Sequence, residues 1–205
     1  MIVNSHNDWD PLEEIIVGHA HHSRIATDIS ARSFSYANFP KEDVVKLEGT
    51  YPQWVIDEAN EDADGLAKAL EDLGVIVHRP KIIDWDKKNY DIGQGWNTKG
   101  WYSWCPRDLI LPLGDMLIET PTPVRARYFE TRLYEDIMYE AFEDGALWMS
   151  APKPKLHDDM YTFEDIENKP TLLDHEICFD APNIVRVGTD LLYQVSNSGN
   201  MKGFK

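Results

Sequence analysis

The chain has 205 residues, of which 42% are apolar and 11% aromatic, so it can bury the core of a domain and is not expected to be disordered. Its formal charge of −16 argues against nucleic acid and anionic membranes as partners, because both attract basic surfaces. No apolar run reaches the roughly 20 residues that span a bilayer, and residues 1–8 lack the basic and then apolar pattern of a leader. With only Cys105 and Cys178, we expect a cytoplasmic protein without a disulfide framework.

The first regular elements predicted along the chain are a strand, a long helix and a second strand. A buried strand is expected at residues 15–17, where three branched apolar residues precede a glycine. A helix is expected over residues 52–73, because proline suits its first turn and Gly74 can end it. The apolar stripe of this helix consists of Val55, Ala59, Ala63, Leu66, Leu70 and Leu73. Residues 75–77 read as the strand that follows.

The segment between the first strand and the helix holds several histidines. His19, His21 and His22 could indicate a metal site, but no acidic or cysteine partner stands at ligand spacing. We therefore expect solvated loop histidines and no metal. The polar and aromatic stretch at residues 33–39 is interpreted as an irregular surface excursion.

The second half of the chain alternates loops with regular elements. Residues 84–104 are predicted to form a long loop, whose tryptophans could line a sugar site but more simply pack in the core. These tryptophans are Trp85, Trp96, Trp101 and Trp104. A helix is expected over residues 125–144 and a strand at 147–149, followed by an acidic loop over 155–175.

Two aspartates, each just before an apolar hairpin, are the main candidate site residues. Asp108 lies in the run 105–114 and Asp180 in the run 178–188; each run ends at a glycine turn and a second apolar run follows. Strand ends present side chains rigidly, and two carboxylates suit a planar cation, best of all a guanidinium. The order hairpin, helix, strand and hairpin predicts an α/β (α+β) fold built from repeating ββαβ modules, in which a third module has begun where the chain stops.

The motif at residues 4–18 strongly resembles the N-terminal signature of the amidinotransferases, the family of glycine amidinotransferase and the inosamine-phosphate amidinotransferases. Further motifs recur in the order of that family. They lie at residues 83–85, 102–108, 127–130, 151–154 and 178–181. The resemblance runs from residue 4 to the end of the chain and covers the first half, or somewhat more, of a family member.

This resemblance implies a fold and a reaction. The fold would be an incomplete, pentein-like α/β-propeller, with residues 1–205 forming a single partial domain of about two to three of the five ββαβ modules. The reaction would transfer the amidino group of arginine to an amine, most simply glycine, through a covalent cysteine intermediate with a histidine as general acid and base. By position, Asp108 would grip the substrate guanidinium and Asp180 would be the catalytic acid that works with the histidine. No cofactor is implied.

The same resemblance places the nucleophilic cysteine and the His-x-Asp motif in the C-terminal half, beyond residue 205. A non-catalytic alternative is therefore a truncated or split half that binds arginine, or that needs a complementary C-terminal half or a homo-oligomer. A second alternative is a guanidino hydrolase of the arginine deiminase type, in which water takes the place of the amine.

Several residues near the motifs have plainer interpretations. Cys105 and Cys178 are expected to be small, partly buried thiols rather than substitute nucleophiles, because nothing indicates a lowered pKa. His175 is expected on an exposed loop. Three arginines could bind an anionic acceptor, but surface ion pairs on a helix are favoured for them. They are Arg125, Arg127 and Arg132.

Overall fold

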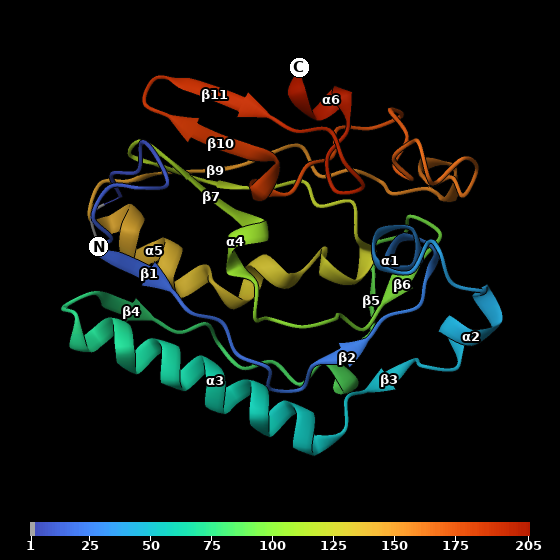
Figure 1. The fold of residues 1–205 in the computed structure, drawn as a ribbon, viewed down its shortest axis with the longest axis horizontal. Coiled ribbons are helices and arrows are strands. Elements are labelled where there is room, and N and C mark those ends of the chain that lie inside the picture. The colour runs from blue at the N-terminus through green and yellow to red at the C-terminus, as the bar shows by residue number, and fades with distance from the viewer. Residues whose placement is uncertain (1–2) are drawn as a thin grey trace.

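The computed structural model describes residues 3–205; the first two residues of the segment considered above for a leader lie outside them. A strand, a helix and a parallel strand open the fold (Figure 1). Strand β1 (Glu14–Ile16) pairs in parallel with β4 (Ile76–His78), and α3 (Gln53–Asp72) connects them. This confirms both predicted strands and the long helix, whose end at Gly74 has a φ of +87°.

The face that α3 buries differs in part from the predicted apolar stripe. Ile56 and Ala67 are the buried residues of the helix, whereas Leu66 is 54% exposed and Leu73 is 81% exposed. The buried direction is rotated by about one residue from the predicted stripe, so the two leucines flank the interface instead of filling it.

The segment between β1 and α3 is more regular than expected. Strand β2 (Arg24–Ile25) pairs antiparallel with β3 (Gly49–Thr50), and two short helices, α1 (Ile29–Ser35) and α2 (Lys41–Val45), lie between them. The interpretation of residues 33–39 as irregular is therefore wrong at its start. Its physical reason is the cap: the carboxylate of the residue before α1 accepts a hydrogen bond from the Ser30 backbone N–H and begins the helix.

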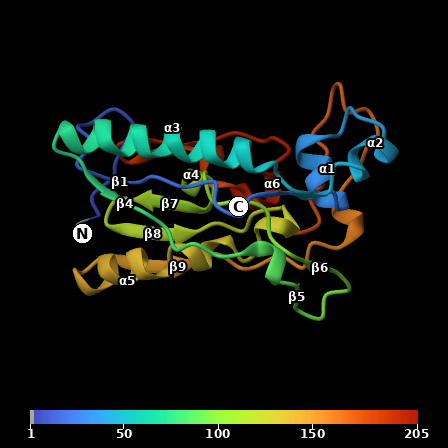
Figure 2. The ribbon, with the colours of Figure 1, turned by 90° about the horizontal axis from the view of Figure 1, so that it is seen from below.

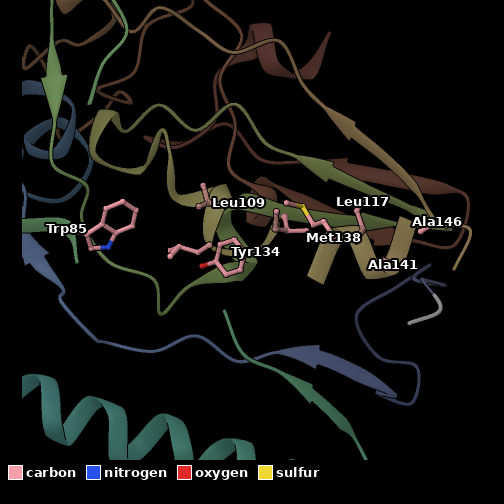
Figure 3. Packing of buried hydrophobic residues seen from close by; sticks show 9 residues of the cluster. Trp85, Leu109, Leu117, Tyr134, Met138, Ala141 and Ala146 are labelled. Carbon is pink, nitrogen blue, oxygen red and sulfur yellow. The ribbon is translucent and has the colours of Figure 1, made fainter. Parts of the chain in front are cut away.

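A complete ββαβ unit follows, as predicted. Strand β7 (Ile110–Leu113) forms an antiparallel hairpin with β8 (Met116–Glu119), and β9 (Leu147–Ser150) pairs in parallel with β8 after α5 (Glu135–Glu143). The helix packs on this sheet around the main buried cluster (Figure 3). That cluster contains Trp85, Leu109, Ile110, Leu117, Leu133, Tyr134, Met138, Ala141 and Ala146. Figure 2 shows α3 and α5 on opposite sides of the strands.

The helix predicted over residues 125–144 is shorter than expected. Only α5 is α-helical, and two 3₁₀ turns, η2 (Arg125–Arg127) and η3 (Glu130–Leu133), precede it. The backbone leaves the helical region at Phe129, with φ −105° and ψ 4°. We attribute the break to the burial of Arg127 against Asp108, a contact from outside the segment that is described below.

The remaining elements are short. The tryptophan-rich segment contains η1 (Trp85–Lys87) and the strand pair β5 (Tyr90–Asp91) and β6 (Asn97–Thr98), so the predicted long loop is only partly a loop. Trp85, Trp96 and Trp101 are at most 9% exposed, which confirms the prediction of core packing for them. The acidic loop contains a 3₁₀ turn, η4 (Asp158–Met160). Among residues 3–205, no helix combines the length and apolarity that crossing a membrane requires.

A second hairpin ends the fold and begins a third unit, again as predicted. Strands β10 (Ile184–Val187) and β11 (Asp190–Tyr193) pair antiparallel, with the 3₁₀ turn η5 (Ala181–Asn183) before them and α6 (Met201–Phe204) after them. These elements are red in Figure 1.

Gly18, the glycine after β1, allows a close approach of two chain segments. A Cβ at this position would lie 2.3 Å from the Ser103 carbonyl oxygen and 2.5 Å from the Trp104 Cα, both backbone atoms. We therefore expect Gly18→Ala to lower the free energy of unfolding by about 2–3 kcal/mol in urea titrations. Gly65→Ala is the matched control, because it lies in α3 with no atom near its Cβ and should stabilise the helix by up to about 1 kcal/mol. Equal effects of the two changes would contradict the role of Gly18.

Candidate active site

Asp108 lies in a one-turn helix just before the first hairpin strand. This helix, α4 (Pro106–Leu109), begins with proline and leads directly into β7. The Asp108 main-chain carbonyl accepts a hydrogen bond from Thr120 Oγ1 at 3.0 Å, which ties the turn to the end of β8. Its carboxylate is 22% exposed and can be reached from outside the core.

Asp180 caps the 3₁₀ turn before the second hairpin and is almost completely buried, at 2% exposure. Its main-chain N–H donates to the Ser198 carbonyl at 2.9 Å and to Asn183 Oδ1 at 3.2 Å, so the backbone position is fixed. Its Oδ1 atom, in contrast, is buried without a hydrogen-bond partner among the described residues. A buried carboxylate oxygen without a donor is costly, and such a group is expected to receive a donor from a ligand or another segment.

The two aspartates precede equivalent hairpins but do not occupy equivalent positions. The turn glycines Gly114 and Gly188 correspond, and Asp108 stands six residues before the first of them, whereas Asp180 stands eight before the second. The hairpin repeat expected from the sequence is confirmed, while the carboxylates are offset by two residues. The turn helices α4 and η5 pack against each other, which brings the two acids close together.

Arg127 holds Asp108 in a buried network that the sequence did not reveal, and its charge also acts on Asp180. Its guanidinium is fully buried and donates from Nη1 to Asp108 Oδ2 at 2.5 Å. It also forms a two-pronged pair with Glu130, at 2.7 Å from Nε and 2.9 Å from Nη2, and donates to the Cys105 carbonyl at 3.1 Å. The face of Tyr102 lies 4.8 Å from its Cζ atom. The expected surface ion pair is therefore wrong for Arg127.

The other two arginines of the same segment differ from each other. Arg125 is also buried, and it donates from Nε to the Leu156 carbonyl at 2.9 Å and from Nη2 to Asp158 at 2.7 Å. The expected surface pairing is wrong for Arg125, because its guanidinium lies over the rings of Trp96 and Tyr161, with its Cζ atom 5.4 and 5.8 Å from the ring centroids. Arg132 is confirmed as a surface residue, 3.7 Å from Glu135.

The electrostatics of the network set the charge of each group. Burial would lower the pKa of Arg127, but the Glu130 carboxylate opposes this and raises that pKa well above its usual value. Burial raises the pKa of Asp180 to about 7, and the negative charge of Asp108 adds to this rise while Arg127 and a hydrogen bond from Thr122 oppose it. A carboxyl group with such a pKa can exchange protons near neutral pH.

The two cysteines and His175 follow the plainer expectations. Burial and then the Asp108 charge raise the pKa of Cys105 to about 11, and burial also raises the pKa of Cys178, so neither thiol is activated. His175 is 53% exposed and lies 3.8 Å from Asp159.

His19 departs from the expectation of a solvated loop histidine. It is 3% exposed, and its Nδ1 lies 3.1 Å from Ser103 Oγ while its Nε2 lies 3.1 Å from the Lys81 carbonyl. Burial lowers its pKa, so the neutral ring serves as a structural bridge to the segment that leads into α4. His21 and His22 are exposed, as expected.

The site thus combines a partly exposed carboxylate held by Arg127 with a buried carboxyl group of near-neutral pKa, one oxygen of which has no hydrogen-bond partner among the described residues. Carboxylates in this arrangement can bind a planar cation and shuttle a proton. One sequence signal could have identified Arg127 and Glu130, namely an arginine and a glutamate three residues apart in a motif with apolar neighbours.

Comparison with known proteins defines first the class of fold and then the family. No family model matches the chain. A solved inosamine-phosphate amidinotransferase from Streptomyces griseus superposes with a TM-score of 0.89 at 40% identity, covering 98% of this chain and 57% of that one. The chain therefore has the pentein-like α/β fold of the amidinotransferases.

The sequence comparisons agree over the whole chain. Inosamine-phosphate amidinotransferase 1 of Streptomyces griseus is 43% identical over 207 residues, covering 100% of this chain and 58% of that protein. The mitochondrial glycine amidinotransferase of Xenopus laevis is 33% identical, covering 99% of this chain and 51% of that protein. The chain belongs to the amidinotransferase family. It spans little more than half the length of these relatives, which is consistent with a counterpart of their N-terminal part.

Proposed function

We propose that this chain is the guanidinium-binding part of an amidinotransferase that moves the amidino group of arginine to an amine. Asp108 grips the substrate guanidinium, and Asp180 is the catalytic acid that works with a histidine. The cysteine nucleophile comes from outside residues 1–205, since both thiols of the chain have raised pKa values, and the proposal takes the histidine from there as well. The observation that carries the proposal is the unpaired, buried Oδ1 of Asp180 close to Asp108.

Glycine is the proposed acceptor, with an inosamine phosphate as the alternative. The relatives named above include enzymes named for each of these acceptors, at 33% and 43% identity. Product formation with each amine, in the chain completed by the C-terminal part of a relative, decides between them. Citrulline formed without any added amine would instead favour the arginine deiminase-like hydrolase.

Arginine binding by the 205-residue chain tests the role of Asp108. We expect Asp108→Ala to weaken binding at least 10-fold in calorimetric titrations, because a bidentate carboxylate partner is lost. Asp64→Ala is the matched control, since Asp64 is an exposed acid that pairs with Arg79 on the surface, at 2.8 Å. Equal affinities of the Asp108 variant and the unchanged chain would contradict the binding role.

We also propose that residues 1–205 form one partial domain of two to three modules that associates with a complementary C-terminal half or with further copies. The proposal is supported by β11, which within residues 3–205 pairs with β10 alone and exposes Leu191 and Leu192 at 46% and 61%. We expect the isolated chain to form concentration-dependent oligomers in sedimentation velocity. A single monomer species at every concentration would contradict this. A cytoplasmic location is part of the proposal, supported by the two free thiols.

A further inference from the structure

The N-terminal segment has no part in the site described above, yet it joins the two aspartate-bearing hairpins. Ser5 and Gly114 exchange main-chain hydrogen bonds of 2.8 and 2.7 Å at the turn of the first hairpin. At the turn of the second hairpin, the Gly188 N–H donates to the His6 carbonyl at 3.0 Å, and Asn7 bridges to Val187. The segment therefore contacts both hairpins at the turns opposite the ends that carry the aspartates.

Arg186 adds a side-chain connection at the same place. It is 5% exposed, and its Nη1 donates to the Pro112 carbonyl of β7 at 2.8 Å and to the Ser5 hydroxyl. Its Nη2 donates to the Asp8 carboxylate. One guanidinium thus connects β10, β7 and the N-terminal segment.

The orientation of the second hairpin depends on the Arg186 contacts more than the orientation of the first hairpin does. Among the eight residues of β10 and β11, Arg186 alone is buried, whereas the first hairpin buries Ile110, Leu111 and Leu117. With little apolar packing, the orientation of β10 is determined mainly by its polar contacts. The hairpin is held at one end by the packing of η5 on α4 and at the other by Arg186.

Asp8 is presented to Arg186 by a tight turn. Asn7 Oδ1 accepts hydrogen bonds from the main-chain N–H groups of Trp9 at 3.0 Å and Asp10 at 2.8 Å, which is an Asx-type turn around Asp8. The Asp8 carboxylate also lies 3.8 Å from Arg107, the neighbour of Asp108. This gives a reason for the acidic and amide residues at the start of the chain.

We propose that Arg186 is a positioning residue that, together with Asp8 and Ser5, holds Asp108 and Asp180 at the spacing needed to share one guanidinium. The inference rests on the proposed function. Misplacement of a binding group by about 1 Å can cost on the order of 100-fold in such sites, so a tilt of β10 is enough to uncouple the two acids.

Arginine titrations of the 205-residue chain test this inference. We expect Arg186→Met to weaken binding at least 10-fold, Asp8→Asn about 3- to 10-fold, and Arg186→Lys by an intermediate factor, because lysine can still reach one acceptor. Arg79→Met, which removes a surface arginine, is the matched control and should leave affinity unchanged. Asp8→Asn keeps the experiment informative if Arg186→Met does not fold.

A double-variant cycle separates positioning from general stability. In the Asp108→Ala background, Arg186→Met is expected to weaken binding no further, since one of the two positioned acids is already gone. A purely structural role would lower the melting temperature without changing affinity at temperatures far below it, and that result would overturn the inference. Arginine binding by the unchanged chain together with full binding by Arg186→Met and Asp8→Asn would also overturn it, while leaving the proposed function intact.

A readout without arginine covers the case in which the unchanged chain binds none and the proposed function fails. The carboxyl carbon of Asp180 is titrated by NMR in labelled protein. In Arg186→Met and Asp8→Asn, the pKa of Asp180 should fall from about 7 towards that of an ordinary carboxyl group, because a loosened hairpin admits water and separates it from Asp108. An unchanged titration would contradict the positioning role.

Discussion

Asp180→Asn is expected to stabilise the fold at pH 8 while it strongly lowers the proposed activity. Burial and the nearby Asp108 charge raise the pKa of Asp180 from 3.8 to about 7. The native state therefore holds a proton that the unfolded state releases above about pH 4. The stability that this proton contributes is fully present below pH 4 and is lost as pH rises through 7. Each unit of pKa difference is worth ~1.4 kcal/mol, so the loss is on the order of 4 kcal/mol.

Asparagine has nearly the same shape as aspartate and carries no charge, so the free-energy cost of burying an ionised Asp180 disappears. We expect Asp180→Asn to raise the free energy of unfolding at pH 8 by about 2 kcal/mol and to flatten its decline between pH 4 and 7. Urea titrations across this pH range measure both effects. Asp108→Asn is the matched control with the opposite expected sign, because it removes the charge of one of the two carboxylates that pair with the buried Arg127.

The functional half of this prediction needs the catalytic groups from outside the chain. In the chain completed by a relative's C-terminal part, Asp180→Asn should lower amidino transfer by roughly 10²–10⁴-fold, the range typical of a lost proton-transfer group. A variant that is both more stable and fully active would show that the raised pKa of Asp180 has no catalytic purpose.

Much of the fold could be predicted because its signals are local. The helix α3 has a proline start, a glycine end and an apolar period, and the hairpins have glycine turns between apolar runs. The ββαβ unit follows from their order. The break before α5 could not be predicted in this way, because we attribute it to the burial of Arg127 against Asp108, a partner 19 residues away in the chain.

The candidate site was predictable only in its two acids. Asp108 and Asp180 each stand just before an apolar hairpin, and the repeat of the hairpin is visible in the sequence. The burial of Arg127 and the bridge formed by His19 depend on residues that are 19 to 84 positions away in the chain. From the sequence alone, charged and polar residues such as these are predicted to lie on the surface. Their burial can be predicted only when the residues that pair with them are known.

Arg127→Met is expected to be the most destabilising change in the site. Methionine fills much of the space of the arginine stem but leaves the fully buried Glu130 carboxylate without its two-pronged partner and Asp108 without its 2.5 Å hydrogen bond. Breaking one side of a buried ion pair typically costs about 3–5 kcal/mol, because the remaining charge keeps its desolvation penalty. We expect a loss of this size in urea titrations at pH 7.

The double variant Arg127→Met with Glu130→Gln identifies the cause. Removing the orphaned charge should recover at least half of the lost free energy, since a neutral amide is far cheaper to bury than a carboxylate. Glu130→Gln alone should be less damaging than Arg127→Met, because Asp108 still balances the arginine charge. Additive losses in the double variant would mean that packing against Tyr102, and not charge balance, makes Arg127 necessary for the fold.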